Sequence, residues 1–358
     1  MVIGGGYGGA TTARALDDIA DVVLVEPREA FHHTIGALRA LVDPDWMPSI
    51  FLSYEQLLER GRVVRDRAIE VGPRRVVLAS GTVLTPDFLV LATGSTYPFP
   101  AKSDHDKIGK AQDRYRRAHQ ELDRADRVLL LGAGPVGIEL AGEISARWPE
   151  KKVTIVDPVD DVLAGRFRQD LRDELRRLAL EAGVELVLGH GLSAPPPGAP
   201  GVHAPFSVST AGGAVIEADI WYQCYGVTRQ TGYVTGALAE AKTSSGAIRV
   251  TDQMRVVGQE TVFAVGDIAE IGENRAYLAS VQAEVAAANI RRQITGDGQV
   301  SAFTEPPDFI VVPFGPDQGS GQLAGNEDLA ESGFVIDVKG KELMIGYAQE
   351  LLGLDTGG

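Results

Sequence analysis

The sequence predicts an α/β fold in which two similar strand–helix–strand units follow one another, the second inserted in the first, with a small C-terminal α+β region at the end. Three observations lead to this prediction. Glycines at positions 4, 6 and 9 directly follow the apolar residues Val2 and Ile3, the same glycine spacing returns at positions 132, 134 and 137, and a strand ending in Gly266-Asp267 follows late in the chain. A strand, a G-x-G-x-x-G turn and a helix open a Rossmann-like dinucleotide-binding domain.

The first glycine turn has the features that a bound dinucleotide requires. Gly4 permits a tight turn, Gly6 lets the backbone approach a pyrophosphate, and Gly9 lets the next helix pack closely against the strand. The N-terminus of that helix then points its N–H groups at the phosphates. A second strand ends at Glu26, twenty-two positions after Gly4, where a carboxylate can accept hydrogen bonds from a ribose 2′-hydroxyl. We therefore predict a dinucleotide site formed by Gly4, Gly6, Tyr7, Gly8, Gly9 and Glu26.

The second unit repeats this arrangement. Residues 127–131 predict a strand, residues 138–144 predict an amphipathic helix, and residues 153–157 predict a strand that ends at Asp157, twenty-five positions after Gly132. Because chance must meet the same spacing twice, two units are more specific than one, and we predict two bound dinucleotides. The second site is predicted to consist of Gly132, Gly134, Pro135, Val136, Gly137, Glu139 and Asp157. Glu139 either contacts the nicotinamide side of the ligand or faces solvent.

The ribose chemistry at Asp157 favours one coenzyme. Its carboxylate suits a free 2′-hydroxyl and repels a 2′-phosphate, and no arginine follows immediately to bind such a phosphate. We therefore expect the second site to bind NADH in preference to NADPH, although Arg166 and Arg168 lie a few residues further on.

Composition limits the class of protein. The 358 residues suggest two or three domains, and the apolar share of 44% is ordinary for a globular protein. The formal net charge of −15 argues against nucleic acid or an anionic membrane as the main partner. Cys224, the one cysteine, excludes an internal disulfide and a dithiol redox pair, and its apolar neighbours favour a buried, inert thiol. No long apolar run, signal peptide or Met-Gly start occurs, and because the first strand is so short we expect residues upstream of Met1.

Between the two glycine turns the sequence predicts a loop, three strands and a crossover. The segment 31–39 suits a loop that runs into a short helix, and its histidines, His32 and His33, line a cofactor, carry protons or have a structural role alone. Strands are expected at 61–65, 75–79 and 88–92. The last strand leads into Thr93 and Gly94, where small residues either let the chain pass close to a cofactor or form an ordinary turn. Residues 106–124 suit an exposed helix.

The second half of the chain alternates helices and strands. A helix is expected at 167–181, a proline-rich loop at 194–200, and strands at 208 and 215–221. The strand before Gly266-Asp267 presents a carboxylate at its tip. An alanine-rich helix at 278–294 follows, and its N-terminal dipole can stabilise negative charge on a ring system. Strand-like segments at 309–312 and 334–338 and an amphipathic segment at 342–354 complete the chain.

Together these motifs resemble those of the two-dinucleotide flavoprotein reductases, which bind FAD in the first site and NAD(P)H in the second. More narrowly, the chain is similar to the ferroptosis-suppressor and apoptosis-inducing-factor group and to the type II NADH:quinone dehydrogenases. The matching stretches cover nearly the whole chain and lie at 4–9, 31–39, 92–100, 148–153, 244–250, 265–267, 276–279 and 319–323.

The resemblance implies that FAD oxidises NAD(P)H and that electrons then pass to a quinone. It also implies FAD contacts for Arg39, Thr93, Gly94, Gly266 and Asp267, and functional roles for His32, His33 and Gln282, the last near the flavin ring. This sequence departs from the group in two respects. It lacks a myristoylation signal, and acidic Glu350 stands where a basic residue near the C-terminus is expected.

The resemblance further implies a division into four segments. Residues 1–105 and 231–300 are expected to form the FAD-binding domain, residues 106–230 the NAD(P)H-binding domain, and residues 301–358 an acceptor or interface region. We expect a cytoplasmic protein; peripheral contact with a membrane and homodimer formation stay open.

Three functions follow from these expectations. The favoured one is an FAD-dependent NAD(P)H oxidoreductase that delivers two electrons to a quinone-type acceptor. The alternatives are electron transfer to a ferredoxin or rubredoxin and a non-turnover flavoprotein that senses NADH. Reduction of disulfides through an internal dithiol is excluded, and sulfide:quinone chemistry is disfavoured, because a second cysteine is lacking.

Overall fold

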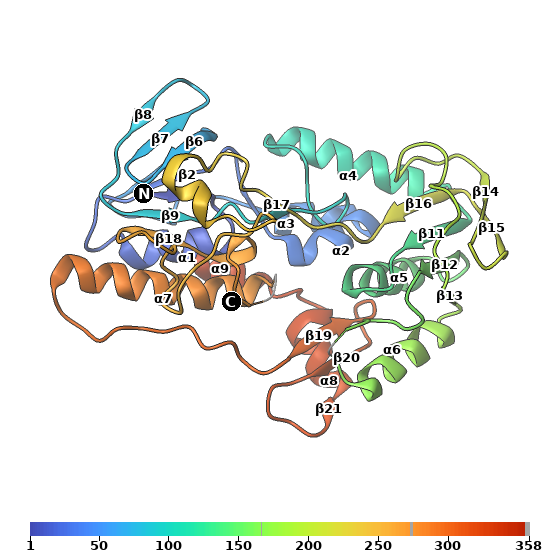
Figure 1. Ribbon diagram of the computed structural model, residues 1–358. Coiled ribbons are helices and arrows are strands. Elements are labelled where there is room, and N and C mark those ends of the chain that lie inside the picture. The colour runs from blue at the N-terminus through green and yellow to red at the C-terminus, as the bar shows by residue number, and fades with distance from the viewer. Residues whose placement is uncertain (166, 273–274, 355–358) are drawn as a thin grey trace.

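Two parallel sheets form the framework of the computed structural model, which describes residues 1–165, 167–272 and 275–354 (Figure 1). The strands of the first sheet lie in the order β18-β9-β1-β2-β5, and every pairing in it is parallel. These strands are β1 (Val2–Ile3), β2 (Val23–Val25), β5 (Arg62–Val64), β9 (Leu89–Leu91) and β18 (Val262–Ala264). Strand β18, from late in the chain, therefore completes a sheet that the first ninety residues begin.

The second sheet is also parallel and has the order β13-β12-β11-β16. Its strands are β11 (Arg127–Leu131), β12 (Lys152–Asp157), β13 (Glu185–Leu188) and β16 (Ile220–Gln223). The α/β fold expected from the sequence is confirmed.

Helices pack against both sheets. In the first half, α1 (Tyr7–Leu16) lies beside α7 (Ala276–Thr295), and a Cβ at Gly8 would come within 3.1 Å of the Ala279 carbonyl oxygen. In the second half lie α4 (Ile108–Asp123), α5 (Pro135–Arg147) and α6 (Gln169–Glu181). The expectation that α4 is simply an exposed helix is wrong, because it buries a stripe formed by Ala111, Tyr115, Ala118 and Leu122.

The two connections between the halves run together. Strand β10 (Ser95–Thr96) pairs with β17 (Thr228–Arg229) in an antiparallel ladder. The chain thus leaves the first half and returns to it at one place, which agrees with an inserted second unit. The domain boundaries at 105, 230 and 300 stay a proposal that this pairing supports.

Smaller elements surround the two sheets. They comprise β3 (Phe31–His32), η1 (Thr34–Gly36), α2 (Ala37–Val42), η2 (Pro44–Trp46), α3 (Met47–Ile50), β4 (Phe51–Leu52), β6 (Ala68–Gly72), β7 (Arg75–Leu78), β8 (Val83–Leu84), β14 (Phe206–Ser209), β15 (Val215–Ala218), η3 (Gly236–Ala241) and η4 (Gly266–Ile268). Within the described ranges, none of the helices combines the length and the apolar character that crossing a bilayer requires.

The C-terminal region is a small sheet with short helices. Its elements are β19 (Ile310–Pro313), β20 (Gly319–Gln322), β21 (Leu329–Ala330), α8 (Ser332–Val335), the π-helical turn η5 (Ile336–Gly340) and α9 (Ile345–Leu351). The strand expected at 334–338 is wrong, because this segment is helical. Val335 is fully buried and Phe334 is exposed, and a Cβ at Gly319 would come within 2.5 Å of Val335, so the helical segment packs closely against β20.

Candidate functional site

The first glycine turn contains glycines that are needed for different reasons. Gly4 has a φ of +100°, and a Cβ at Gly9 would lie 1.8 Å from the carbonyl oxygen of Gly4. The protein itself therefore requires both glycines. Gly6 differs, because its φ of −72° suits any residue and a Cβ there would meet nothing within 4 Å. Glycine at this exposed position keeps free the space at the start of α1, where a ligand can approach the backbone.

The second glycine turn has the same geometry. Gly132 has a φ of +111°, a Cβ at Gly137 would lie 1.9 Å from the carbonyl oxygen of Gly132, and a Cβ at Gly134 would again meet nothing within 4 Å. Gly134, with a φ of −74°, stands before α5 as Gly6 stands before α1. Neither helix start has a side-chain cap, so the N–H groups of both first turns face the open space. The chain thus holds two equivalent cradles for phosphate groups.

An acidic residue is fixed beside each cradle in the same way. The Glu26 carboxylate accepts hydrogen bonds from the backbone N–H groups of Gly5 at 2.6 Å and Arg28 at 2.8 Å. The Asp157 carboxylate accepts hydrogen bonds from the backbone N–H groups of Ala133 at 2.7 Å and Val159 at 2.8 Å. Each carboxylate oxygen keeps a second lone pair for a ribose hydroxyl. These roles stay predictions, although Glu26 is only 2% exposed.

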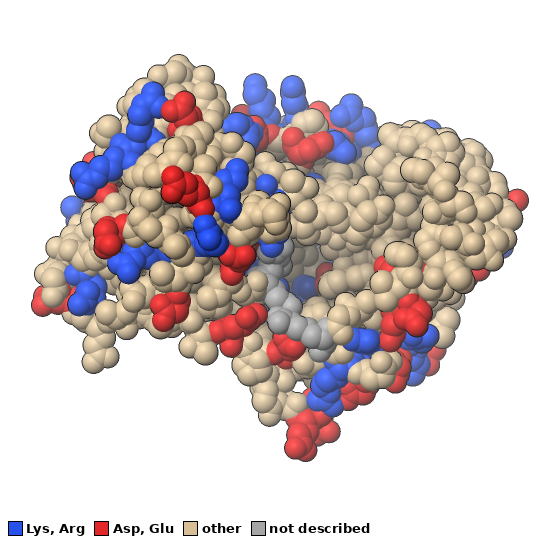
Figure 2. All heavy atoms as spheres, viewed as in Figure 1, with Lys and Arg blue, Asp and Glu red and all other residues tan. Residues whose placement is uncertain are grey.

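A cavity of about 750 Å³ lies between the two halves, and Figure 2 shows the surface hollowed there. Segments from the whole chain line it. They include Thr34, Ile35 and Leu38 near α2, Ser95, Tyr97 and Lys102 of the crossover, Pro135, Val136 and Glu139 of α5, Asp267 and Gly272, Ala276 and Tyr277 of α7, and Phe309, Lys339, Met344 and Tyr347 of the C-terminal region. Its volume lies within the range of cofactor and ligand sites.

The Gly266-Asp267 turn is held in place by the side chain of Gln282 from α7. Gly266 has a φ of +73°, and its N–H group donates to the side-chain oxygen of Gln282 at 2.7 Å, while the Gln282 amide donates to the Ile271 carbonyl at 2.8 Å. Gln282 is 1% exposed, so both ends of its amide are bound by the backbone. Gln282 therefore positions this turn. Its predicted catalytic role near the flavin ring stays a prediction.

Asp267 itself faces the cavity in a small polar cluster. Its carboxylate accepts hydrogen bonds from the Ser95 hydroxyl and from the Lys102 ammonium, the latter at 3.3 Å. Lys102 was not predicted as a site residue, because nothing near it in the sequence indicates that it reaches a carboxylate 165 residues away. The pair gives this end of the cavity one acid and one cation at a site where a phosphate or hydroxyl group can bind.

Thr93 and Gly94 lie where β9 leads into the crossover. The Thr93 hydroxyl donates to the Gln230 carbonyl at 2.6 Å and lies 3.0 Å from the Tyr233 hydroxyl. Gly94 has a φ of +62°, which a glycine adopts without strain. The Thr93 side chain therefore ties the outgoing and returning connections together, and its predicted FAD contact stays a prediction.

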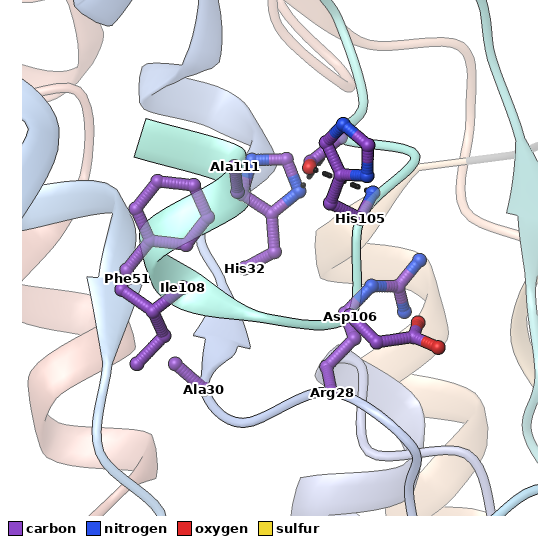
Figure 3. A pocket seen from close by; sticks show the side chains of 9 residues that line it. Arg28, Ala30, His32, Phe51, His105, Asp106, Ile108 and Ala111 are labelled. Carbon is purple, nitrogen blue, oxygen red and sulfur yellow. Dashed lines mark hydrogen bonds between the residues drawn. The ribbon is translucent and has the colours of Figure 1, made fainter. Parts of the chain in front are cut away.

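His32 lies in a small cavity of about 10 Å³ (Figure 3). Its ring stacks on Phe51 with centroids 5.2 Å apart, and its Nδ1 accepts a long hydrogen bond of 3.5 Å from the Ser103 N–H group. Among the described residues, neither the His32 Nε2 nor the Arg28 Nε on the same cavity wall has a hydrogen-bond partner. Burial, followed by the charge of Arg28, lowers the pKa of His32 well below 6.5. The ring is therefore neutral near pH 7, and it has a nitrogen available for a group from outside the protein.

His33 connects the first helix to the C-terminal region. Its Nε2 donates to the Leu343 carbonyl at 2.7 Å, which leaves Nδ1 to accept the Tyr7 hydroxyl at 2.8 Å. The residue is fully buried, and burial lowers the pKa of His33 to about 4. With both nitrogens bound and the ring neutral, His33 positions Tyr7; a catalytic role stays a prediction.

Arg39 has protein partners on two other elements, and its predicted cofactor contact stays a prediction. Its guanidinium binds the Glu143 carboxylate of α5 with two hydrogen bonds, one of them 2.9 Å long, and donates to the Gly340 carbonyl at 2.8 Å. Both side chains are less than 10% exposed. Burial raises the pKa of Glu143, and Arg39 opposes this shift. Arg39 therefore joins α2, α5 and η5, and the sequence could not indicate a partner 104 residues away.

Glu139 faces the cavity and not open solvent. It forms an ion pair with Lys339 of η5 at 2.7 Å, and both side chains are less than 20% exposed. The C-terminal region thus places a cation beside α5, the helix that follows the second cradle. Glu350, the acidic residue at the position where the resemblance implies a basic one, lies on α9.

These residues fit the two predicted dinucleotides. Two open cradles at helix N-termini suit two pyrophosphates, and an acid beside each cradle suits a ribose. Pro135 and Val136, which follow the second cradle, line the cavity together with Asp267, the start of α7 and the Glu139–Lys339 pair. Arg166, which bears on the predicted choice of coenzyme, lies outside the described residues.

Comparison with known proteins agrees with this geometry. The sequence profile of the pyridine nucleotide-disulphide oxidoreductases matches residues 1–288. Ferroptosis suppressor protein 1 of Taeniopygia guttata is 30% identical over 335 residues, which cover 91% of this chain and 88% of that protein. The human protein of the same name is 29% identical, with 91% and 88% covered. Apoptosis-inducing factor homolog B of Dictyostelium discoideum is 27% identical, with 90% and 89% covered.

Two solved structures share the fold. A ferredoxin reductase from Rhodopseudomonas palustris superposes with a TM-score of 0.66 at 20% identity and covers 87% of this chain and 78% of that one. The reduced CoADR-RHD protein of Bacillus anthracis gives a TM-score of 0.69 at 19% identity, with 89% and 60% covered.

Proposed function

Because the chain belongs to the pyridine nucleotide-disulphide oxidoreductase family, we propose that it oxidises NADH with bound FAD and delivers two electrons to a quinone-type acceptor. Membership makes the chain an oxidoreductase that uses FAD and NAD(P)H, and the resemblance inferred from the sequence is confirmed. The preference for NADH and the identity of the acceptor are the proposal.

One observation carries the proposal: the start of α5, directly after the second cradle, and the Asp267 turn, directly after β18 of the first sheet, line a single cavity of about 750 Å³. A reductase of this kind must bring two ring systems together, and a cavity lined by segments from both sheets meets that requirement. A protein that only bound the two nucleotides would not need to bring these two segments to one cavity.

The overall reaction balances with an acceptor from outside the chain. NADH gives up a hydride, which is two electrons and one proton, and a quinone takes up two electrons and two protons to become a quinol, so one proton comes from solvent. Cys224 is the one cysteine in the sequence, it is buried, and burial raises the pKa of its thiol to about 12. The electrons therefore have no internal disulfide to reduce.

The chain's own residues bind, orient and stabilise. The first cradle with Glu26 holds FAD, which when bound accepts the hydride and passes electrons on, and the second cradle with Asp157 holds NADH. The first turn of α7 lines the cavity, where the dipole of this helix favours negative charge. Lys339, held by Glu139 at 2.7 Å, places a cation at the meeting point of the two halves. His33 and Gln282 keep Tyr7 and the Gly266 turn in position.

The rim of the cavity favours a flat aromatic acceptor. Tyr277 is 51% exposed and meets Phe309 edge to face at 5.6 Å, and Arg275 lies over Phe309 at 4.8 Å. Ring surfaces of this kind stack on a quinone head group. The net charge of −15 opposes docking to an acidic ferredoxin.

Rapid-mixing kinetics test the proposal. The flavin-loaded protein is mixed with NADH or NADPH under argon and then with a short-chain quinone, a ferredoxin or oxygen. We expect fast bleaching of the flavin by NADH and fastest recovery with the quinone. Slow recovery with every acceptor would favour an NADH sensor, fastest recovery with ferredoxin would favour the other alternative, and a chain that holds no flavin would contradict the whole proposal.

A further inference from the structure

The loop that follows Asp157 packs against the second phosphate cradle. The N–H group of Leu163 donates to the Ala133 carbonyl at 2.9 Å, and the N–H group of Ala133 donates to Asp157 at 2.7 Å. Residues near Leu163 therefore border the place where the ribose of the proposed NADH lies. Asp161 is two residues before Leu163, and two residues span at most about 7 Å.

Asp161 is the centre of an ion-pair cluster with two arginines of α6. Its carboxylate accepts a hydrogen bond from Arg176 at 2.5 Å and lies 3.7 Å from the guanidinium of Arg172. Gln169 donates to the same carboxylate at 3.1 Å. Asp161 is only 14% exposed, and although burial alone would raise its pKa, these donors hold the pKa below the usual value. The carboxylate is thus charged and fixed at neutral pH.

Arg172 and Arg176 are one helical turn apart and therefore share one face of α6. The Arg172 guanidinium also donates to the Gly165 carbonyl, which places it against the loop that follows Asp157. The Nε atoms of both arginines are buried and have no hydrogen-bond partner among the described residues. A 2′-phosphate on the adenosine ribose is bound well by guanidinium groups beside it. Here both guanidinium groups form ion pairs with Asp161.

We propose that Asp161 is a second determinant of coenzyme choice, which keeps Arg172 and Arg176 in ion pairs and so denies them to the 2′-phosphate of NADPH. The proposal rests on the proposed binding of NADH at the second cradle. Asp157 repels the phosphate directly, and Asp161 removes the cations that would otherwise bind it. Selection against NADPH is thus shared by two acids four residues apart.

Binding of two nucleotide fragments tests the proposal without turnover. The flavin-loaded full chain is titrated calorimetrically with ADP and with adenosine 2′,5′-bisphosphate, two isomers whose second phosphate is attached to the 5′-phosphate in ADP and to the ribose 2′-oxygen in the bisphosphate. Wild-type protein should bind ADP more tightly. In Asp161→Asn, which keeps the shape and an oxygen for Gln169, the bisphosphate should bind at least about tenfold more tightly than in wild type, with little change for ADP. Replacing Arg172 and Arg176 by Gln in the same variant should abolish that gain.

A control and a second measurement complete the test. Glu174→Gln removes one acid from the same helix, where Glu174 pairs with Arg177 at 2.7 Å, and it should leave both affinities unchanged. If Asp161→Asn does not fold, the Arg172→Gln/Arg176→Gln variant with Asp161 in place tests the proposal. It should bind the bisphosphate as tightly as the wild type, because Asp161 already keeps both arginines from the phosphate.

The proposal is wrong if that double variant loses bisphosphate affinity, if Asp161→Asn changes both fragments alike or neither, or if the wild-type chain binds the bisphosphate as tightly as ADP. Failure of both fragments to bind would remove the second cradle as a nucleotide site, and with it the proposed function; a change confined to the acceptor kinetics would leave this proposal intact.

Discussion

At the scale of single residues, the two kinds of glycine in each turn separate folding from binding. Gly9 and Gly137 are enclosed by backbone, whereas Gly6 and Gly134 face space that the protein leaves open. A methyl group at the first kind must strain the chain, and at the second kind it can only obstruct a ligand. The geometry thus assigns each glycine a distinct consequence of substitution.

We predict that Gly9→Ala destabilises the protein by about 3 kcal/mol, because the new Cβ would lie 1.8 Å from the Gly4 carbonyl oxygen. Gly6→Ala should change the free energy of unfolding by no more than about 1 kcal/mol, and yet weaken retention of flavin by an order of magnitude or more. Urea unfolding and flavin absorbance after gel filtration measure the two effects. Gly134→Ala is the matched control and should keep the flavin; equal flavin loss in both variants would contradict separate sites.

Protonation of His33 should lower stability on acidification. Burial holds the pKa of His33 at about 4 in the folded chain, against 6.5 when unfolded. Between these values the unfolded chain binds more protons, so stability is complete above about pH 6.5 and is lost as the pH falls toward 4. The full shift corresponds to about 3 kcal/mol. Thermal unfolding between pH 7 and pH 5 should show a steeper loss in wild type than in His33→Gln, which keeps one donor and one acceptor; identical slopes would refute this role of His33.

At the scale of elements, the Arg39–Glu143 pair joins helices from different halves of the molecule. It connects α2 with α5, and the third hydrogen bond of Arg39 reaches Gly340 of η5. The interface between the halves is therefore held by a buried charge pair in addition to apolar packing.

We predict that Glu143→Ala costs about 3–5 kcal/mol in the free energy of unfolding, because the charge of Arg39 is left buried and unpaired. The double variant Arg39→Met/Glu143→Leu should cost clearly less, since both charges are removed. A double-mutant cycle in urea measures the coupling between the two side chains. Additive losses would show that Arg39 does not depend on Glu143.

Elements with strong local signals were predictable from the sequence. The glycine turns, the strands that precede them and the helices that follow depend on residues within about thirty positions, so their pattern is complete locally. The segment 334–338 was mispredicted because a short apolar segment fits the period of a strand and that of a helix equally well. In the structure it is helical, with Val335 buried and Val338 on the cavity wall. Strand β6 was missed because exposed Glu70 interrupts its apolar pattern, and β8 was missed because it consists of only two residues.

The parts of the candidate site that depend on distant partners could not be predicted. Glu139 meets Lys339 across 200 positions, and Asp267 meets Lys102 across 165. Both lysines come from segments without a motif, and their placement is a result of the packing of the two halves. The sequence thus indicated the cradles, whereas the ion pairs on the cavity wall required the structure.

At the scale of the whole molecule, the net charge of −15 bears on the choice of acceptor. In the view of Figure 2, acidic side chains lie among the basic ones, and wide areas carry neither. The electrostatic field of the protein does not change the association rate of a neutral quinone, whereas the association rate of a charged protein depends on it.

We therefore predict that recovery of the flavin with a neutral quinone changes less than about twofold when the salt concentration rises from 20 mM to 500 mM, because screening acts only between charges. Recovery with a ferredoxin should change severalfold over the same range. Rapid mixing at several ionic strengths measures both. A strong salt dependence with the quinone would show that charge governs access to the cavity.

The pairing of β10 with β17 has a consequence for how such a chain is assembled. Ser95 lies opposite Arg229, and facing residues of an antiparallel ladder are about 5 Å apart, so the two cut ends left by excising everything between them almost touch. The half between β10 and β17, which we propose binds NADH, is therefore suited to exchange as one segment. The corresponding segment of a relative with the opposite coenzyme preference, spliced at these two points, should fit the rest of this chain. One recombination event is then sufficient to change the coenzyme that such a protein oxidises.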